Sequence, residues 1–358
     1  MQALQNVRTF EVALRRLDSI LEGKTHVLGL STLDSLYLTV LENAYTQSDM
    51  EEVSVSHRVQ AVLASIVVLQ DRVSLDVLTH LLDLSAEDAF ETLRELQSVI
   101  FFDELDLHAG KIRPLHLTFR EFLSDKARCK NNDFYIDTHF YHGRLAVTCL
   151  ELINSAMHTN MCNLSHPTVF KDDLPDLQSL IHDNIAPHVQ YACKYWAIHL
   201  SNANVTERLS GALRVFCENK LLVWLEAMSL MSGLDTAVQA FTSSRTWCQG
   251  HPLNETLQES SNLLFDGYRL LLEFFEPINQ NPEQIYVSAL PLAPMCRLVE
   301  RYACGQRQSG THCLKLFNTR RPQWDACLRV LEGHHGDVRQ VKFSHDGQYI
   351  VSVDSSDT

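Results

Sequence analysis

Apolar residues recur at intervals of three and four over much of this 358-residue chain, and this spacing restricts the fold more than any other feature. Such spacing gathers apolar side chains on one face of an α-helix. The pattern runs from residue 134 to about residue 320, where prolines separate its segments. The strongest predicted helices there cover residues 185–200, 209–231 and 257–275. The sequence therefore predicts a mainly α fold.

A shorter unit precedes this region, between residues 54 and 126. Each of its first three predicted helices follows a serine, as expected of an N-cap: Ser56, Ser74 and Ser85. Two β runs, at 99–102 and 112–116, then flank a turn at 108–111. Three short helices followed by a hairpin are the layout of a winged helix. A further helix is expected over 118–126, with three apolar residues on one side: Phe119, Phe122 and Leu123.

The first 50 residues predict two more helices. One covers residues 4–21 and lacks a capping residue, so we expect the chain to begin inside a domain. The other follows Ser31, which forms a capping-box pattern with Asp34. Between them stands the only Gly-Lys-Thr, at 23–25, but Asp18 occupies the place of the first P-loop glycine. It follows a helix rather than a strand, and we interpret it as a helix end and turn.

After residue 323 the pattern changes from helix to strand. Val338, Val341 and Phe343 precede an Asp-Gly pair, and a second β run follows at 349–352. Two β runs about Asp-Gly predict a hairpin. The sequence stops at Thr358 in what reads as the middle of this hairpin. We expect its open edges to make the tail poorly soluble or disordered.

Composition and charge exclude several classes of protein. The chain has 30 Lys and Arg against 44 Asp and Glu, a net charge of −14, which disfavours binding to nucleic acid and to anionic membranes. Hydrophobic residues make up 45%, as in ordinary soluble proteins. The most apolar uncharged stretch, 59–70, is too short to span a bilayer, and no signal peptide is evident. The 10 cysteines form no C-x-x-C pair, so we expect reduced thiols in a cytoplasmic protein.

Residues 331–347 resemble the opening of a WD-repeat propeller blade. The structural positions of that pattern are Gly333, His334, Asp346 and Gly347. A propeller needs several blades of about 40 residues, so we expect only a partial blade here. Trp324-Asp325 lies too close before this pattern to end a preceding blade. The aspartate that pairs with the blade histidine falls near Ser356, which predicts incomplete hydrogen bonding of His334.

Six segments, in the same order, resemble the large fungal NACHT–WD-repeat proteins of the STAND class, relatives of vegetative-incompatibility proteins and NOD-like receptors. They are residues 33–41, 114–123, 191–200, 224–230, 284–290 and 324–328. The resemblance implies that this chain is the middle of a longer protein and lacks the P-loop domain. It divides the chain into a helical lid remnant after the NACHT ATPase core, a winged-helix domain, a helical linker domain and an incomplete first blade. The expected boundaries are 1–50, 51–130, 131–322 and 323–358.

The resemblance also implies a role and one site residue. The chain would be a non-catalytic regulatory module that couples a WD-repeat sensor to a nucleotide-binding switch, with protein partners and homo-oligomers of the full-length family. Residues 116–122 match the winged-helix motif His-x-[Ser/Thr]-Phe-x-[Glu/Asp]-Phe, whose histidine approaches the phosphate of bound ADP in NACHT proteins. His116 takes that role by resemblance; the competing interpretation is a packed histidine at a strand–helix junction. No cofactor is expected in this chain itself, since ATP and ADP belong to the NACHT domain.

The sequence leaves two other functions open and gives no sign of a metal site. The chain could join ATP or ADP binding by docking onto a NACHT domain supplied elsewhere. A DNA-binding winged helix is weaker, because the candidate recognition helix at 85–99 is acidic and phosphates would repel it. No metal site is expected, because neither near-pair, His139 with His142 or Cys162 with His166, has a second spaced pair. No local signature indicates a catalytic nucleophile.

Overall fold

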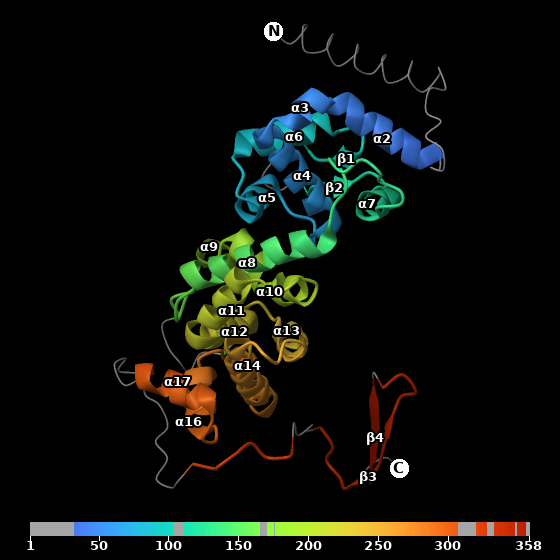
Figure 1. The fold of residues 1–358 in the computed structure, drawn as a ribbon. Helices are drawn as coiled ribbons and strands as arrows, with labels where there is room; N and C mark the ends of the chain where they lie inside the picture. The colour runs from blue at the N-terminus through green and yellow to red at the C-terminus, as the bar shows by residue number, and fades with distance from the viewer. Residues whose placement is uncertain are drawn as a thin grey trace.

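A computed structural model of the chain is mainly α-helical and has two small antiparallel sheets of two strands each (Figure 1). This confirms the predicted mainly α character of the fold. The structure describes residues 32–103, 111–164, 170–174, 176–306, 320–327, 333–347 and 349–355. The predicted helix over 4–21, the Gly-Lys-Thr at 23–25, Ser31 and Ser356 lie outside these ranges. Within them no helix is both long and apolar enough to cross a lipid bilayer.

The first part of the described chain has the predicted order of three helices and a hairpin. Its elements are α2 (Thr32–Ala44), α3 (Gln47–Glu51), α4 (Val53–Val68), α5 (Leu75–Leu82), α6 (Ala86–Glu95), β1 (Ile100–Phe101), β2 (Arg113–Pro114) and α7 (Leu117–Ser124). The strands pair antiparallel, with Ile100 opposite Pro114. Helices α4, α5 and α6 pack on one another around a buried apolar core. We call residues 32–124 the N-terminal unit.

Two of the three predicted N-caps are confirmed. The Ser74 hydroxyl accepts from the Val77 amide at 3.5 Å, and the Ser85 hydroxyl accepts from the Asp88 amide at 3.0 Å. The third prediction is wrong, because α4 begins at Val53 and Ser56 lies within its first turn. Its amide donates to the Glu52 carbonyl, so the helix starts one turn earlier without a side-chain cap.

The second part is a stack of helices. Its elements are α8 (Thr138–Ala156), η1 (Lys171–Asp173), α9 (Leu177–Asn184), α10 (Pro187–Ser201), α11 (Glu207–Asn219), α12 (Leu221–Leu230), α13 (Leu234–Gln249), α14 (Glu255–Glu273), α15 (Phe275–Gln280), the π-helix η2 (Ile285–Ala289), α16 (Leu290–Leu292) and α17 (Arg297–Gln306). Helix α8 packs on α10 and α11, and α13 packs on α10 and α14 (Figure 1). We call residues 138–306 the helical stack.

The predicted continuous helix over 209–231 is wrong, because the chain forms two helices that meet at Lys220. The Tyr302 hydroxyl lies at this break. It donates to the Cys217 carbonyl at 2.8 Å and accepts from the Leu221 amide at 3.0 Å. A side chain from α17 thus satisfies backbone groups that a helix break leaves without partners.

Four buried aromatic rings join the middle of the helical stack. Trp196 and Phe216 have ring centroids 4.7 Å apart, Trp224 meets Phe216 at 5.7 Å, and Phe241 meets Trp224 edge-on at 5.3 Å. These rings come from α10, α11, α12 and α13 in turn. Edge-to-face contacts add about 1 kcal/mol each to the burial of such rings. This aromatic column therefore fixes four helices to one another.

The last described residues form two features. The indole of Trp324 donates to the Asp266 carboxylate at 2.9 Å, and Arg269 donates to the carbonyls of Asp325 and Cys327, so residues 324–327 are held against α14. Strands β3 (Val338–Phe343) and β4 (Ile350–Asp354) form the predicted antiparallel hairpin. Its apolar side chains are largely exposed on both faces. Whether it belongs to a propeller blade stays a prediction.

Candidate functional site

His116 stands between β2 and α7, where it is the N-cap residue of the helix. Its side chain is exposed, and so are the flanking Leu115 and Leu117. The opposite face of α7 is buried, with Phe119 and Phe122 fully inside the core. The structure therefore places this histidine at the surface, on the end of a helix that is otherwise packed.

The proton of the neutral His116 ring can be assigned from its contacts. The Thr118 amide donates to Nδ1 at 3.3 Å, so Nδ1 is an acceptor. The Thr118 hydroxyl lies 2.7 Å from the same atom and 2.7 Å from the Tyr37 hydroxyl. Nδ1 accepts from Thr118, Tyr37 supplies the next hydrogen, and the ring proton lies on Nε2. This N–H has no partner among the described residues and can donate to an external acceptor.

The start of α7 is held rigidly from α2. The Tyr37 ring lies 5.1 Å from Phe119 and 5.5 Å from Phe122, centroid to centroid. Arg128, just beyond α7, makes three hydrogen bonds to the buried Asp34 carboxylate, the shortest at 2.7 Å. Asp34 therefore anchors Arg128; the predicted capping box involves Ser31, which lies outside the described residues.

A cavity of about 640 Å³ lies beside α7. Cationic side chains line it: Arg72, Lys111, Arg113 and Arg120. One carboxylate, Asp71, faces them, and Leu115 and Leu117 form its rim beside His116. In a chain of net charge −14, this cluster makes a locally positive surface that favours an anion.

The four predicted blade positions lie at the β3–β4 hairpin. Gly347 has φ of 69°, a conformation that the turn requires and that glycine adopts without strain. The Asp346 carboxylate accepts from the Ser344 hydroxyl in this turn at 2.6 Å. Gly333, with φ of 154°, comes directly before His334.

The predicted gap in the hydrogen bonding of His334 is wrong. Its Nδ1 lies 3.0 Å from the Asp354 carboxylate, and its Nε2 lies 2.6 Å from the Ser352 hydroxyl. The sequence comparison placed the carboxylate near Ser356, which is outside the described residues. Asp354, two residues earlier and at the end of β4, supplies it instead.

The candidate recognition helix, α6, is partly neutralised. Arg58 on α4 contacts the Asp88 carboxylate at 2.9 Å and the Glu91 carboxylate at 3.2 Å. These ion pairs hold two carboxylates of α6 against α4. Glu87 and Glu95 leave its exposed surface acidic, which gives DNA phosphates no attraction.

The residues of the weighed metal pairs have other partners. His139 bonds to the Asn202 carbonyl at 2.8 Å, and His142 lies 2.9 Å from the ring of His199. Cys162 is buried, where desolvation raises the pKa of its thiol to about 11, and His166 is outside the described residues. Across the described ranges no three such groups converge on a metal position.

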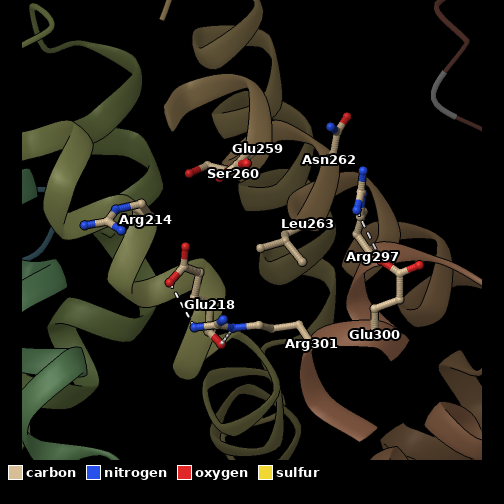
Figure 2. Close-up of a pocket in the computed structure, with 9 residues that line it drawn as sticks. All are labelled: Arg214, Glu218, Glu259, Ser260, Asn262, Leu263, Arg297, Glu300 and Arg301. Atoms are coloured by element: carbon tan, nitrogen blue, oxygen red, sulfur yellow. Dashed lines mark hydrogen bonds and ion pairs between the residues drawn. The ribbon is translucent and has the colours of Figure 1, made fainter. Parts of the chain in front are cut away.

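Sequence reasoning missed a charged pocket of about 330 Å³ between α11, α14 and α17 (Figure 2). Arg301 contacts Glu218 at 2.9 Å, Arg297 contacts Glu300 at 3.2 Å, and Leu263 lies between these pairs. Its residues come from three helices far apart in sequence, so no local motif indicates it. The paired charges cancel one another, which leaves a weaker field than the surface beside His116.

Sequence reasoning also missed a buried carboxyl. Glu226 is the one charged residue of α12, and that was the signal that could have found it. One carboxylate oxygen accepts from the backbone amide of Asn160 at 2.8 Å, and the other accepts from the Tyr286 hydroxyl at 3.0 Å. Burial outweighs these bonds and raises the pKa of Glu226 to about 7.

Comparison with known proteins supports a relationship to fungal incompatibility proteins. The chain is 28% identical over 356 residues to "Vegetative incompatibility protein HET-E-1" of Podospora anserina. The alignment covers 92% of this chain and 25% of that protein, so the chain spans about a quarter of the length of the curated relative it matches. No protein-family model matches the chain, and no solved structure matches it.

Proposed function

We propose that this chain is a non-catalytic regulatory module of a cytoplasmic signalling protein of the vegetative-incompatibility kind. In this proposal the N-terminal unit and the helical stack couple a WD-repeat sensor to the nucleotide state of a NACHT domain. The similarity over 92% of the chain supports the signalling role. The observation that carries the mechanism is the outward Nε2–H of His116, which fits a phosphate oxygen.

His116 would hold the nucleotide only while a NACHT domain stands against α7. ADP bound to that domain would supply a phosphate as the acceptor. His116 would donate to it, and the cations beside α7 would add attraction for the same charge. Because the ring is exposed, the bond is lost as soon as the two domains separate. The histidine can therefore report domain position without any chemical step.

At the C-terminal end of the module, residues 324–327 connect the helical stack to the β3–β4 hairpin, which lies on the side of the WD-repeat sensor in this proposal. Residues 324–327 are held against α14 by Asp266 and Arg269, and β3 begins shortly after them, at Val338. A force on the hairpin would thus reach α14 first. Loss of this attachment would uncouple the sensor from the helices.

Fluorescent ADP binding tests the role of His116. A NACHT domain from a related protein is titrated with ADP bearing a fluorescent ribose label, with and without this chain at saturating concentration. One charge-assisted hydrogen bond contributes about 1.5 to 3 kcal/mol, so we expect the chain to tighten ADP binding about ten-fold or more. His116→Ala should abolish this gain. His182→Ala, an exposed histidine on α9, is the matched control and should keep it.

The outcomes separate the candidate functions. Equal tightening by the wild type and His116→Ala would refute the phosphate contact. Tightening that His116→Ala abolishes would support the phosphate contact, both for a NACHT domain of the same protein and for one supplied elsewhere. ATP hydrolysis by the chain alone would refute the non-catalytic role. Salt-sensitive binding to duplex DNA at micromolar concentration would favour the DNA-binding alternative instead.

A further inference from the structure

A chain of buried hydrogen bonds crosses from the N-terminal unit to the helical stack. The backbone amide of Gln70, just after α4, donates to the Tyr191 hydroxyl on α10 at 3.1 Å. That hydroxyl lies 2.9 Å from Nε2 of His199, and Nδ1 of His199 lies 2.9 Å from Nδ1 of His142 on α8. The rings of Tyr191 and His199 are buried, and that of His142 is half-buried. Two helices, α8 and α10, and a backbone amide of the N-terminal unit therefore meet in one polar line.

The contacts assign a direction to the protons of this line. The Tyr191 oxygen accepts from Gln70, so its own hydrogen is available to donate to Nε2 of His199. His199 then carries its proton on Nδ1 and donates to Nδ1 of His142. In this arrangement, with both rings neutral, each short contact has one donor and one acceptor. A second proton on His142 would place two N–H groups face to face, or would force the proton of His199 onto Nε2. In the second case Gln70 and His199 would both donate to the Tyr191 oxygen, and the buried Tyr191 hydrogen would lose its acceptor.

A second histidine pair lies at the same junction. His80 on α5 and His188 on α10 stack with ring centroids 4.0 Å apart and an angle of 3° between their planes. Two neutral rings can stack at this distance, but two imidazolium ions would repel each other. Helix α10 therefore meets the N-terminal unit through the Gln70–Tyr191 hydrogen bond and the His80–His188 stack, while the His142–His199 pair extends the line within the helical stack.

We propose that this junction is a proton-sensitive joint, in which protonation of His142 disrupts the line from Gln70 to His142, protonation of His188 disrupts its stack on His80, and the two together loosen the N-terminal unit from the helical stack. The inference does not depend on the proposed function. It needs the Gln70–Tyr191 hydrogen bond and the His80–His188 stack to lie in the contact between the units, as they do. The ligand in this proposal is the proton.

The surroundings make the neutral state the stable one at neutral pH. Burial lowers the pKa of His199 to about 3, and it also lowers the pKa of His142 and of His188. Titratable groups that act on the line come from the same two helices and the loop after α4: His139, Cys149, Tyr195, Asp71 and, for His188, His80. None of the groups that act on His142 or His188 is a carboxylate that would favour the charged ring.

The direction of the pH effect follows. The unfolded or opened chain binds protons at the ordinary histidine pKa of 6.5, whereas the closed joint does not. The closed state is therefore fully favoured above pH 6.5 and loses stability as the pH falls below it. One linked proton raises the opening equilibrium about ten-fold per pH unit.

Hydrogen exchange of the full chain tests the joint. Protection of the Gln70 amide and of α10 is measured at pH 7.5 and 5.5 and corrected for the intrinsic exchange rate. We expect opening of this junction to increase about ten-fold or more, while the aromatic column on the α11 to α13 side keeps its protection. A wild-type joint with equal protection at both pH values would overturn the proposal.

Variants identify the side chains that make the joint sensitive to pH. In His142→Gln/His188→Gln, the amide oxygen at 142 can still accept from His199, but neither side chain can take a proton, so protection should stay high at pH 5.5. Tyr191→Phe keeps the packing and removes the line, so the Gln70 amide should exchange faster at both pH values. His182→Gln on α9 is the control and should behave as wild type. Undiminished pH dependence in the double variant would also overturn the proposal.

Discussion

Glu226→Gln is the substitution whose effect the structure predicts most directly. The carboxyl is buried in α12 and its two oxygens accept from Asn160 and Tyr286. A glutamine keeps the size of the side chain. Its oxygen can accept from the Asn160 amide, and its nitrogen can donate to the Tyr286 oxygen. The main change is therefore the loss of a titratable group.

The magnitude comes from the pKa. Burial raises the pKa of Glu226 from its ordinary value of 4.5 to about 7. Between these values the folded protein keeps a proton that the unfolded chain releases, so the free energy of unfolding falls as pH rises. Above pH 7 the whole loss is present. Each pKa unit corresponds to about 1.4 kcal/mol, which gives a total of about 3 kcal/mol.

Urea denaturation followed by tryptophan fluorescence measures this effect between pH 5 and pH 8. The free energy of unfolding of the wild type, minus that of Glu226→Gln, should fall by about 2 to 3 kcal/mol over this range. Taking the difference removes the contributions of all other groups, including the histidines. Glu259→Gln, an exposed change on α14, is the control and should give a flat difference. A flat difference for Glu226→Gln would refute the assignment of a buried proton.

Three further predictions concern the free energy of unfolding, measured by urea denaturation at pH 7.5. Gly267→Ala should lower it by about 2 kcal/mol, because the added Cβ would come 2.8 Å from the Phe241 ring. Gly211→Ala is the control and should be neutral or stabilising, because open space surrounds that position. Arg128→Ala should cost about 2 kcal/mol, because it removes the guanidinium from a buried carboxylate; no loss would show that water replaces it. Ser85→Ala should cost about 1 kcal/mol through the lost N-cap, and an unchanged midpoint would contradict that role.

The helices were predictable where the deciding forces are local. Ser74 and Ser85 cap their helices as expected, because a serine needs only an amide three residues away. The break at Lys220 was not predictable, because no proline or glycine marks it. Tyr302, more than 80 residues further on, supplies the hydrogen bonds that replace those of the helix. Tertiary contacts decide such boundaries.

The candidate site shows the same division. The motif at 116–122 identified His116, but only the structure shows which ring nitrogen is occupied and which faces outward. The pairing of His142 with His199 joins residues 57 apart in the chain, and no spacing rule indicates it. Asp354 as partner of His334 was missed because the expected position was taken from the blade pattern rather than from the bend of this hairpin.

The contrast between the two kinds of contact indicates where this module would move. The helical stack is joined by the aromatic column, whose rings interlock and lose many contacts at once if they separate. The junction with the N-terminal unit adds directional contacts to its apolar packing, namely the Gln70–Tyr191 hydrogen bond and the His80–His188 stack. Directional bonds fail together when one donor becomes misplaced, whereas packed rings resist small displacements. If His116 reports the position of a NACHT domain, the motion that releases it is therefore expected at the α10 junction, with the helical stack moving as one body.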